Sequence, residues 1–430
     1  MPDTTSLSTS STESLPTNPV ATPTLPTLPP AVKRKYDEIR ESFPTNGRSK
    51  KKRAKRSPNA QRTAAERLDS VARYFVRAVH TFKNISSVMQ DAAEHRWGSP
   101  APDEPSNEVR MPASERARQQ ANIAAFDAMF TVAPDLLEVV KHFFLECSSC
   151  PDNWNHLTSS MHASATSART SDTGGLKNCL HYVLPNPAQH VMHPPVATTD
   201  PKSVRGLAHP ILRYLILGWP DRLRLPPLVF PTINSAVEAV GTPDDGPNEF
   251  LDRIVNGNVE IKNDALPSFL WAEGAYNPEN FDKGLLRGEF PLRVLRHIWT
   301  GPRSAINGLD KGIPAVCNAR LHNKYTVDEY MIANAVVQAR GMLSTRDWAP
   351  RDGAFDNEKL FDQIVKLFSK KDDAWVIETL AWQVFGDYEA PAVDDPEETA
   401  EPSPADDILA QRAARQAAAA SSAAAMASGS

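Results

Sequence analysis

Four residues have the types, and part of the spacing, of a zinc site. Cys147 and Cys150 are separated by two residues, as in many zinc knuckles, and Cys179 and His181 could complete a tetrahedral set. The second pair has the spacing C-x-H, however, and helix is predicted for the segment between the two pairs. The alternative is that the first two cysteines are ordinary thiols at a helix end. We predict no metal and no cofactor, with these four residues as candidates for a metal and His156 as a substitute ligand.

Two polar clusters, at 167–177 and 317–322, contain residue types that could hold an anion. The first includes Arg169, Lys177 and two adjacent glycines, and the second includes Arg320 and His322. Both are predicted to be loops, in which glycine permits close approach of the backbone to a ligand. Arg287, in a basic segment, is a fifth candidate contact. The alternative is that these side chains cap helices, bond to loops or lie on a solvated helix face.

No catalytic motif accompanies these residues. The sequence lacks the phosphate-binding motif G-x-x-x-x-G-K-[ST], the nucleophile motif G-x-S-x-G, the zinc-protease motif H-E-x-x-H and the kinase motif set. An enzyme that uses both polar clusters stays open as an alternative, and it requires that the two clusters meet in one pocket. The sequence favours a protein without enzymatic activity.

The strongest functional signal is a pair of basic clusters near the N-terminus. They comprise Lys33, Arg34, Lys35, Lys50, Lys51, Lys52, Arg53, Lys55 and Arg56. Their surroundings, rich in Ser, Thr and Pro, cannot bury enough apolar surface to fold. We interpret the clusters as a nuclear localisation signal, because an extended peptide can place successive basic side chains in acidic pockets of a nuclear import receptor. The alternatives are a tail that binds nucleic acid weakly and nonspecifically through phosphates, or a solvated charge run.

The balance of basic and acidic residues differs between the two ends of the chain and its middle. Residues 1–60 contain 11 Lys and Arg against 5 Asp and Glu, whereas residues 386–430 contain 2 against 9, in a chain of 430 residues. The middle segment is mildly acidic, which disfavours a basic surface for nucleic acid. Four cysteines exclude a disulfide scaffold, and no run of about 20 apolar residues could span a membrane. We expect a soluble nuclear protein with no membrane partner.

The elements that must position these residues are predicted to be mostly helices, because their apolar residues recur at helical spacing. Apolar residues spaced by three and four predict one long helix over 61–97 and a second one that begins near Ser114 and breaks at Pro134. Further helices are predicted at 152–170, 175–183, 285–299, 326–344, 356–369 and 372–385. Segments 98–112 and 185–247 are rich in proline and are predicted to be loops.

The predicted fold class is all-α, with a single irregular multi-helix domain over 61–386 and Pro-rich loops. Residues 1–60 are predicted to be a disordered leader, and residues 387–430 a disordered tail that is acidic and then Ala-rich. Alanine favours helix, so the Ala-rich part is predicted to form a lone, marginal helix without tertiary contacts.

Several ordered motifs connect the chain to a known family. They are SARTSDTGGLK (167–177), RGLAH (205–209), LPSFLW (266–271), GLLRG (284–288), RVLRHIWTGPRSA (293–305), CNARLH (317–322) and WVIETLAWQVFG (375–386). From about Arg73 to Gly386 the chain resembles a domain family of unknown function that is expanded in mushroom-forming basidiomycete fungi. The resemblance implies one domain over most of the chain and carries no established activity, fold or catalytic residue.

These observations predict a nuclear protein-interaction module that binds an unidentified protein partner. The first alternative is a nucleic-acid-associated protein that uses its basic leader for nonspecific phosphate contacts. The second is an enzyme or anion-binding protein that uses the segments 167–177 and 317–322.

Overall fold

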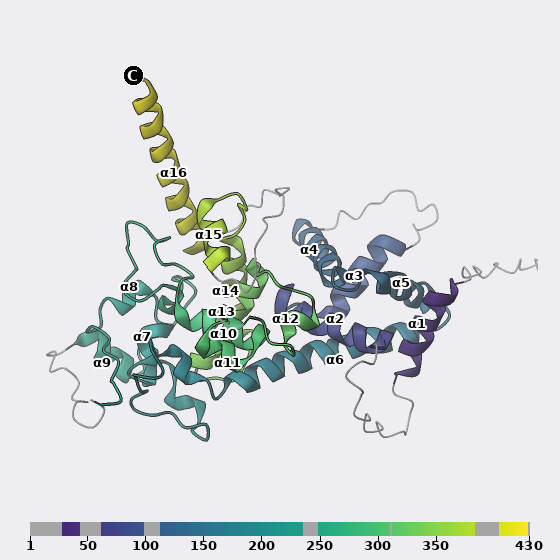
Figure 1. Ribbon diagram of the computed structural model, residues 1–430, viewed down its shortest axis with the longest axis horizontal. Helices are drawn as coiled ribbons and strands as arrows, with labels where there is room; N and C mark the ends of the chain where they lie inside the picture. Colours follow the sequence, from purple (N-terminus) through teal and green to yellow (C-terminus); the bar gives the residue numbers. More distant parts are fainter. Residues whose placement is uncertain are drawn as a thin grey trace, which may run out of the picture.

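Helices account for nearly all regular structure in the computed structural model, which describes residues 28–43, 62–98, 112–234, 248–309, 312–382 and 404–428 (Figure 1). Within these ranges the chain forms sixteen α-helices, six short 3-10 helices and one two-stranded hairpin. One main apolar core joins helices from both ends of the chain, from Ile39 near the N-terminus to Ile408 near the C-terminus. The prediction of an all-α fold is therefore confirmed.

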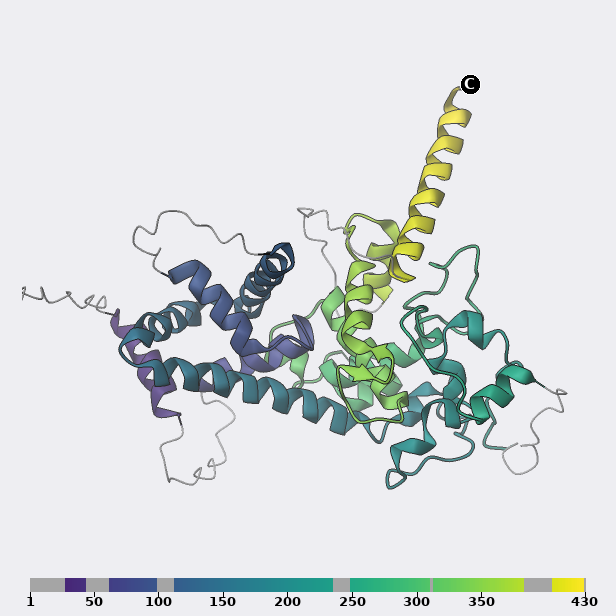
Figure 2. The ribbon, with the colours of Figure 1, turned by 180° about the vertical axis from the view of Figure 1, so that it is seen from behind.

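The N-terminal helices pack around one long helix. They are α1 (Pro30–Glu41), α2 (Ala64–Ala78), α3 (Ile85–Trp97), α4 (Ala113–Phe130), α5 (Leu137–Leu145) and α6 (Pro151–Leu176). α6 runs lengthwise along α2 and α3 and continues into the second half of the molecule (Figure 1 and, from behind, Figure 2). Its buried residues Leu157, Met161, Ala165 and Ala168 have the spacing of an amphipathic helix.

The single helix predicted over 61–97 is wrong, because the chain turns between α2 and α3. In the turn, the Nδ1 of His80 accepts from the backbone N–H groups of Phe82 and Lys83 at 3.2 and 3.1 Å. Asn84 then caps α3 through its side-chain oxygen. The apolar period continues across the turn because residues on both sides face the core, so periodicity does not reveal the break.

The second half of the molecule is arranged around α13, which is buried on nearly all sides. Its α-helices are α7 (Leu212–Ile216), α8 (Trp219–Arg222), α9 (Glu249–Val255), α10 (Glu289–Thr300), α11 (Pro302–Asn307), α12 (Asn318–Leu321), α13 (Glu329–Leu343), α14 (Asn357–Lys366) and α15 (Ala374–Trp382). Strands β1 (Arg351–Asp352) and β2 (Phe355–Asp356) pair antiparallel. Because α13 packs against α2 as well as α10 and α14, it joins the two halves.

Short 3-10 helices connect these elements. They are η1 (Pro134–Leu136), η2 (Glu146–Ser148), η3 (Leu180–Val183), η4 (Lys202–Val204), η5 (Gly206–Ala208) and η6 (Ser268–Leu270). The helix predicted at 175–183 is therefore mostly η3, a single tight turn. Helices predicted within 285–299, 326–344, 356–369 and 372–385 are each present, as α10, α13, α14 and α15.

The polar cluster 167–177 is helical rather than a loop. It forms the last turns of α6, which continue through Gly174 and Gly175. Asp172 explains why the helix continues here, because its carboxylate accepts two hydrogen bonds of 2.7 Å from the buried guanidinium of Arg77 on α2. This tertiary contact outweighs the low helix propensity of the two glycines.

Part of the predicted disordered leader is also helical. In α1, Tyr36 and Ile39 are buried in the core, and the hydroxyl of Tyr36 donates to Glu146. The first basic cluster lies on this helix, where Lys35 forms a 2.6 Å ion pair with Asp135. Tyr36 and Ile39 are three residues apart, a short apolar stripe that the surrounding charged and polar residues obscure in the sequence. The second basic cluster, 50–56, lies outside the described residues.

The C-terminal tail contains the helix predicted for its Ala-rich part, and only the predicted lack of tertiary contacts is wrong. Its Ala-rich part forms α16 (Pro404–Ser428), and the first half of that helix packs on the domain while the second half projects away from it (Figure 1). Ala405 and Ile408 are buried in the core, so the helix has tertiary contacts. Residues 383–403, which include the acidic part of the tail, lie outside the described residues.

The described helices include two long ones, α6 with 26 residues and α16 with 25. None of them combines the length and the apolar character needed to cross a bilayer.

Candidate functional site

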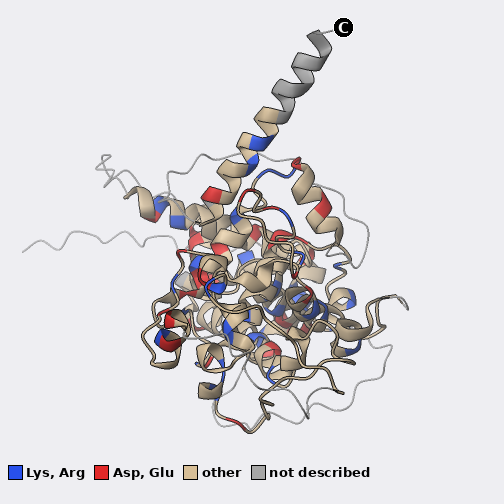
Figure 3. Cartoon of the chain, turned by 90° about the vertical axis from the view of Figure 1, so that its left-hand side faces the viewer, with Lys and Arg blue, Asp and Glu red and all other residues tan. Residues whose placement is uncertain are grey.

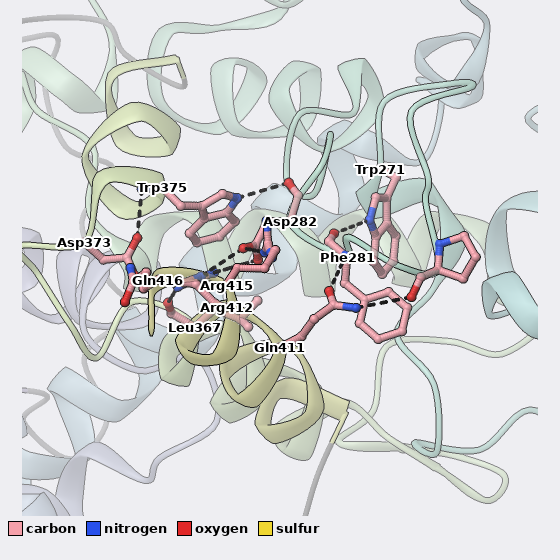
Figure 4. Close-up of polar contacts among 11 residues, drawn as sticks. Trp271, Phe281, Asp282, Leu367, Asp373, Trp375, Gln411, Arg412, Arg415 and Gln416 are labelled. Atoms are coloured by element: carbon pink, nitrogen blue, oxygen red, sulfur yellow. Dashed lines mark hydrogen bonds and ion pairs between the residues drawn. The ribbon is translucent and has the colours of Figure 1, made fainter. Parts of the chain in front are cut away.

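The first half of α16 lies in a groove formed by three separate segments of the domain (Figure 4). They are the loop 278–282, the end of α14 and the start of α15. We call the surface formed by Phe281, Asp282, Leu367, Asp373 and Trp375 the acidic groove. Ala405 and Ile408 anchor the apolar end of α16, and the contacts with the acidic groove are polar.

Arg412 occupies the centre of the acidic groove. Its guanidinium lies between two carboxylates, with Nη2 at 3.2 Å from Asp282 Oδ1 and Nη1 at 3.8 Å from Asp373 Oδ2. It also donates to the backbone oxygen of Leu367 at 3.3 Å and lies 4.1 Å from the centroid of the Trp375 ring. Arg412 and both carboxylate residues are less than a tenth exposed, so their attraction is shielded from water.

Three further side chains of α16 extend this contact (Figure 4). Arg415 Nη2 donates to Asp282, and Gln416 Nε2 donates to Asp373 at 3.0 Å. Gln411 forms two hydrogen bonds, of 2.6 and 3.2 Å, with the backbone of the adjacent loop. Side chains at 411, 412, 415 and 416 share one face of a helix, so α16 presents two arginines and two glutamines together.

The acidic groove is held in shape by contacts that do not involve α16. Trp375 Nε1 donates to the backbone oxygen of Asp282 at 3.2 Å, and Trp271 Nε1 donates to that of Phe281 at 2.8 Å. Asp373 Oδ1 accepts from the backbone N–H of Trp375 at 2.8 Å, at the start of α15. The domain therefore positions both carboxylates and the indole ring itself.

The chemistry of the acidic groove suits a guanidinium-bearing helix. Among the described residues, the arginines of α16 are the only ion-pair partners of Asp282 and Asp373. Arginine matches such a surface because its planar guanidinium bonds to two carboxylates at once and stacks on an aromatic ring. A vacated groove would leave two carboxylates and one exposed indole face, a combination that favours a cation over a neutral side chain.

The predicted anion contacts separate into different cavities. Arg169 and Lys177 line a cavity of about 860 Å³ beside the end of α6. Arg320 lines a second cavity of about 470 Å³, and His322 lines a third of about 290 Å³. The two polar clusters therefore do not meet in any of these three cavities.

Three of the predicted anion contacts have structural partners instead. The guanidinium of Arg320 donates to the backbone oxygen of Pro314 at 3.0 Å. His322 is only 5% exposed and faces the interior. Arg287 lies 3.5 Å from the carboxylate of Glu378, with its guanidinium 5.9 Å from the ring centroid of Trp382. Arg169 also donates to a backbone oxygen, that of Thr81 at 3.0 Å, but it lines the cavity of about 860 Å³ together with Lys177. These two are therefore predicted contacts that one cavity brings together.

The four metal candidates cannot bind one ion. Cys150 directly precedes α6 and Cys179 follows it, and this helix of 26 residues is about 40 Å long. Cys179 Sγ lies instead 3.5 Å from the backbone oxygen of Gly175 and 3.8 Å from a ring nitrogen of His297. Within the part of the chain that the structure describes, no three His, Cys, Asp or Glu groups are placed to hold a metal ion.

Sequence reasoning missed the acidic groove. Asp282 and Asp373 lie 91 positions apart, and nothing local in the sequence indicates that they meet. The available signal is the run Gln-Arg-Ala-Ala-Arg-Gln at 411–416, which interrupts an Ala-rich segment with four polar side chains on one helix face. Such a pattern is typical of a helix that makes specific contacts.

Charges of both signs are intermingled over the body of the molecule. Figure 3 shows Lys and Arg next to Asp and Glu along most described helices, without separation by sign. The arrangement contains many structural ion pairs, such as Arg340 with Asp352 at 2.7 Å and Lys371 with Glu329. This distribution gives no support to a basic nucleic-acid interface on the domain.

Comparisons with known proteins place the chain by sequence. A search of the curated proteins and a search of the solved structures each gave no significant match. A model described as a family of unknown function (DUF6698) matches residues 163–383, just over half of the chain. The match begins within α6 and ends directly after α15, so it includes the acidic groove and excludes α16. The chain belongs to this family of unknown function.

Proposed function

We propose that this protein is a nuclear protein-interaction module whose acidic groove binds an arginine-bearing helix of a protein partner. The observation that supports this most directly is the position of Arg412, held between Asp282 and Asp373 and against the ring of Trp375. In this proposal α16 occupies the groove in the absence of the partner, and the partner helix takes its place.

The composition of the contact supports an exchangeable helix. Among the side chains of α16 that the structure describes, Ala405 and Ile408 are the buried apolar ones, and together they contribute little apolar area. Elements with few buried apolar contacts open at low free-energy cost. A partner helix with a longer apolar stripe and the same two arginines would bind more tightly than α16 does.

Selectivity follows from charge. A helix with Lys at the position of Arg412 lacks the planar guanidinium that bonds to both carboxylates. A helix with Glu there meets two carboxylates of its own charge and is repelled. Asp282 and Asp373 therefore reject most helices, and the glutamines at 411 and 416 fix the register of those that bind. The partner class is a helix with the spacing Gln-Arg-x-x-Arg-Gln.

The nuclear part of the proposal is supported by the two basic clusters, 33–35 and 50–56. A nuclear import receptor is the first partner that they imply, and weak nonspecific contact with nucleic acid is a second role that the same residues allow. The sequence motifs also support a basidiomycete origin for the family, which is part of the same proposal.

The test uses the full-length chain and a labelled peptide that spans residues 404–428. In wild type, the covalently attached α16 competes with the peptide; the double substitution Arg412→Gln and Arg415→Gln weakens this competitor. We expect the variant to bind the peptide more tightly than wild type, measured by fluorescence anisotropy. Adding Asp282→Asn to the variant should reduce affinity at least about tenfold, because it removes one carboxylate from a buried charge pair.

Glu260→Gln, at an exposed carboxylate away from the groove, is the matched control and should leave affinity unchanged. If the double variant binds the peptide equally well with Asp282→Asn added and with Glu260→Gln added, recognition by the acidic groove is refuted. Failure of the vacated groove to bind the peptide at all would refute exchange of the helix.

A further inference from the structure

The cavity of about 860 Å³ beside α6 has an excess of positive charge. Four cationic side chains line it, Arg169, Lys177, Lys202 and Arg205. The acidic side chains that line it are Asp200 and Asp347. Asp200 accepts a hydrogen bond of 2.7 Å from a backbone N–H of its own loop, and the side chain of Asp347 is fully exposed. Four cations against two carboxylates leave an excess of positive charge in the cavity, although Asp347 lies 3.9 Å from Lys202.

Arg205 is the most unusual of the four. It is 1% exposed, and its guanidinium bonds to two backbone oxygens, that of Met342 at 3.0 Å and that of Lys177 at 3.5 Å. Its Nε has no hydrogen-bond partner within the described residues, and the charge of Asp200 acts on it there without a contact at ion-pair distance. A buried guanidinium without an anion is costly, so an anion next to Arg205 would be stabilising.

Arg169 and Lys202 repeat this pattern. Arg169 donates to the backbone oxygen of Thr81 at 3.0 Å and forms no ion pair within the described part of the chain. Lys202 Nζ donates to the backbone oxygen of Arg346 at 2.7 Å, with Asp347 at 3.9 Å. Burial is the main cause that lowers the pKa of Arg169, Lys202 and Arg205. Nearby carboxylates, Asp347 for Lys202 and Asp200 for Arg205, offset this lowering only in part.

The remaining walls offer hydroxyl groups and an apolar face. Thr166, Thr170 and Thr173 follow one side of α6 at spacings of four and three. Gln338 is 2% exposed, and its Nε2 lacks a hydrogen-bond partner among the described residues. Trp348 supplies the apolar face, with its ring stacked on that of Phe82 at 5.6 Å between centroids.

We propose that this cavity binds a small organic phosphate monoester. The phosphate would lie among Arg169, Lys202 and Arg205, and the organic part against Trp348. Phosphate fits these groups better than a carboxylate does, because it carries more charge and offers three terminal oxygens to several donors. The volume is that of a small-molecule site, which disfavours a folded macromolecule as the ligand.

Sequence and topology explain why only part of this site could be expected. Arg169 and Lys177 belong to one polar cluster on α6, whereas Lys202 and Arg205 come from η4 and the residue that follows it. α13 and the loop after it close the third side. The site is separate from the acidic groove, so the two proposals stand or fail independently.

The test is isothermal titration calorimetry of the full-length protein with adenosine 5′-monophosphate, ribose 5-phosphate, adenosine and inorganic phosphate. We expect both monoesters to bind, adenosine not to bind, and inorganic phosphate to bind more weakly than either monoester. Lys202→Gln and Arg169→Gln should each weaken binding of the monoesters at least about tenfold, since each removes a charged hydrogen-bond donor.

Lys141→Gln, at a half-buried lysine on α5 outside the lining of the cavity, is the control and should change affinity less than about twofold. If the Arg205→Met variant folds, it should also lose binding of the monoesters. If it does not fold, the Lys202→Gln and Arg169→Gln variants test the proposal. Absence of heat with both monoesters at millimolar concentration overturns the proposal. Binding that Lys202→Gln and Arg169→Gln leave unchanged overturns it as well, because the ligand then lies elsewhere.

Discussion

Two buried histidines show how burial changes what a residue type can do. Burial lowers the pKa of both His80 and His322 to about 3, with nearby cations, Lys83 for His80 and Arg77 first for His322, adding to the effect. For His80 the geometry agrees, because its Nδ1 accepts two backbone hydrogen bonds and must be unprotonated to do so. Neither residue acts as a cation in the folded protein at neutral pH.

These pKa values predict a loss of stability in mild acid. In the unfolded chain a histidine titrates near 6.5, so between pH 6.5 and about 3 the unfolded state binds more protons than the folded state. The contribution of each such histidine to the free energy of unfolding keeps its full value above pH 6.5. Below pH 6.5 this contribution falls by about 1.4 kcal/mol per pH unit. Urea unfolding at pH 7, 5.5 and 4 should therefore show a shallower decline for His80→Asn than for wild type. His95→Asn, at an exposed residue, is the control, and an identical decline in all three proteins would contradict the prediction.

Two of the four cationic side chains that line the cavity of about 860 Å³ lie in a segment that the sequence singles out. Arg169 and Lys177 stand out because they lie close together in a polar, glycine-containing segment. Lys202 and Arg205 do not, because their contribution depends on side-chain hydrogen bonds to backbone oxygens at the end of α13, those of Gly341 and Met342. Asp282 and Asp373 were missed for the same reason, since their role depends on a meeting of distant segments.

At the scale of elements, α6 illustrates why local propensity failed. Ser, Thr, Asp and Gly crowd the segment 167–177 and predict a loop. The buried residues Ala165, Ala168, Asp172 and Leu176 nevertheless continue the helical period to the end of α6. Packing on one face, with the ion pair of Asp172, stabilises the helix more than its composition destabilises it.

Alanine substitutions at the two adjacent glycines of α6 are expected to change the stability of the protein differently. A Cβ added at Gly174 would meet no atom within 4 Å, so Gly174→Ala should stabilise the protein by about 0.5–1 kcal/mol by reducing the freedom of the unfolded chain. A Cβ at Gly175 would lie 3.1 Å from Nε2 of His297, so Gly175→Ala should gain less than Gly174→Ala or lose stability. Urea unfolding of both variants provides the comparison. A larger gain at Gly175 than at Gly174 would mean that the end of α6 is packed differently.

At the scale of the whole molecule, described parts of both the N-terminal leader and the C-terminal tail belong to the fold. Composition predicts disorder for them, since apolar residues are sparse there. α1 and α16 nevertheless pack on the domain through a few apolar side chains, Tyr36 and Ile39 in α1 and Ala405 and Ile408 in α16, supported by ion pairs. Average composition cannot reveal so few anchors, because their effect depends on the groove that receives them.

The packing of α1 predicts that the two basic clusters contribute unequally to nuclear import. Import receptors bind basic residues on an extended chain, whereas Lys33, Arg34 and Lys35 lie on a helix that Tyr36 and Ile39 hold against the core. Lys35 is further engaged by Asp135, whose pKa its two cationic partners Arg67 and Lys35 hold well below the usual range. We therefore expect import to depend on the cluster 50–56.

This expectation can be measured as the nuclear-to-cytoplasmic ratio of a fluorescent fusion of the full-length chain. Replacing Lys51, Lys52 and Arg53 with glutamine should abolish nuclear accumulation, because it removes the centre of the longer cluster. The variant Lys33→Gln with Arg34→Gln leaves the pair of Lys35 with Asp135 intact and should accumulate almost as wild type does. The reverse order of effects would show that α1 leaves the core for the receptor, so that its docking on the domain is itself reversible.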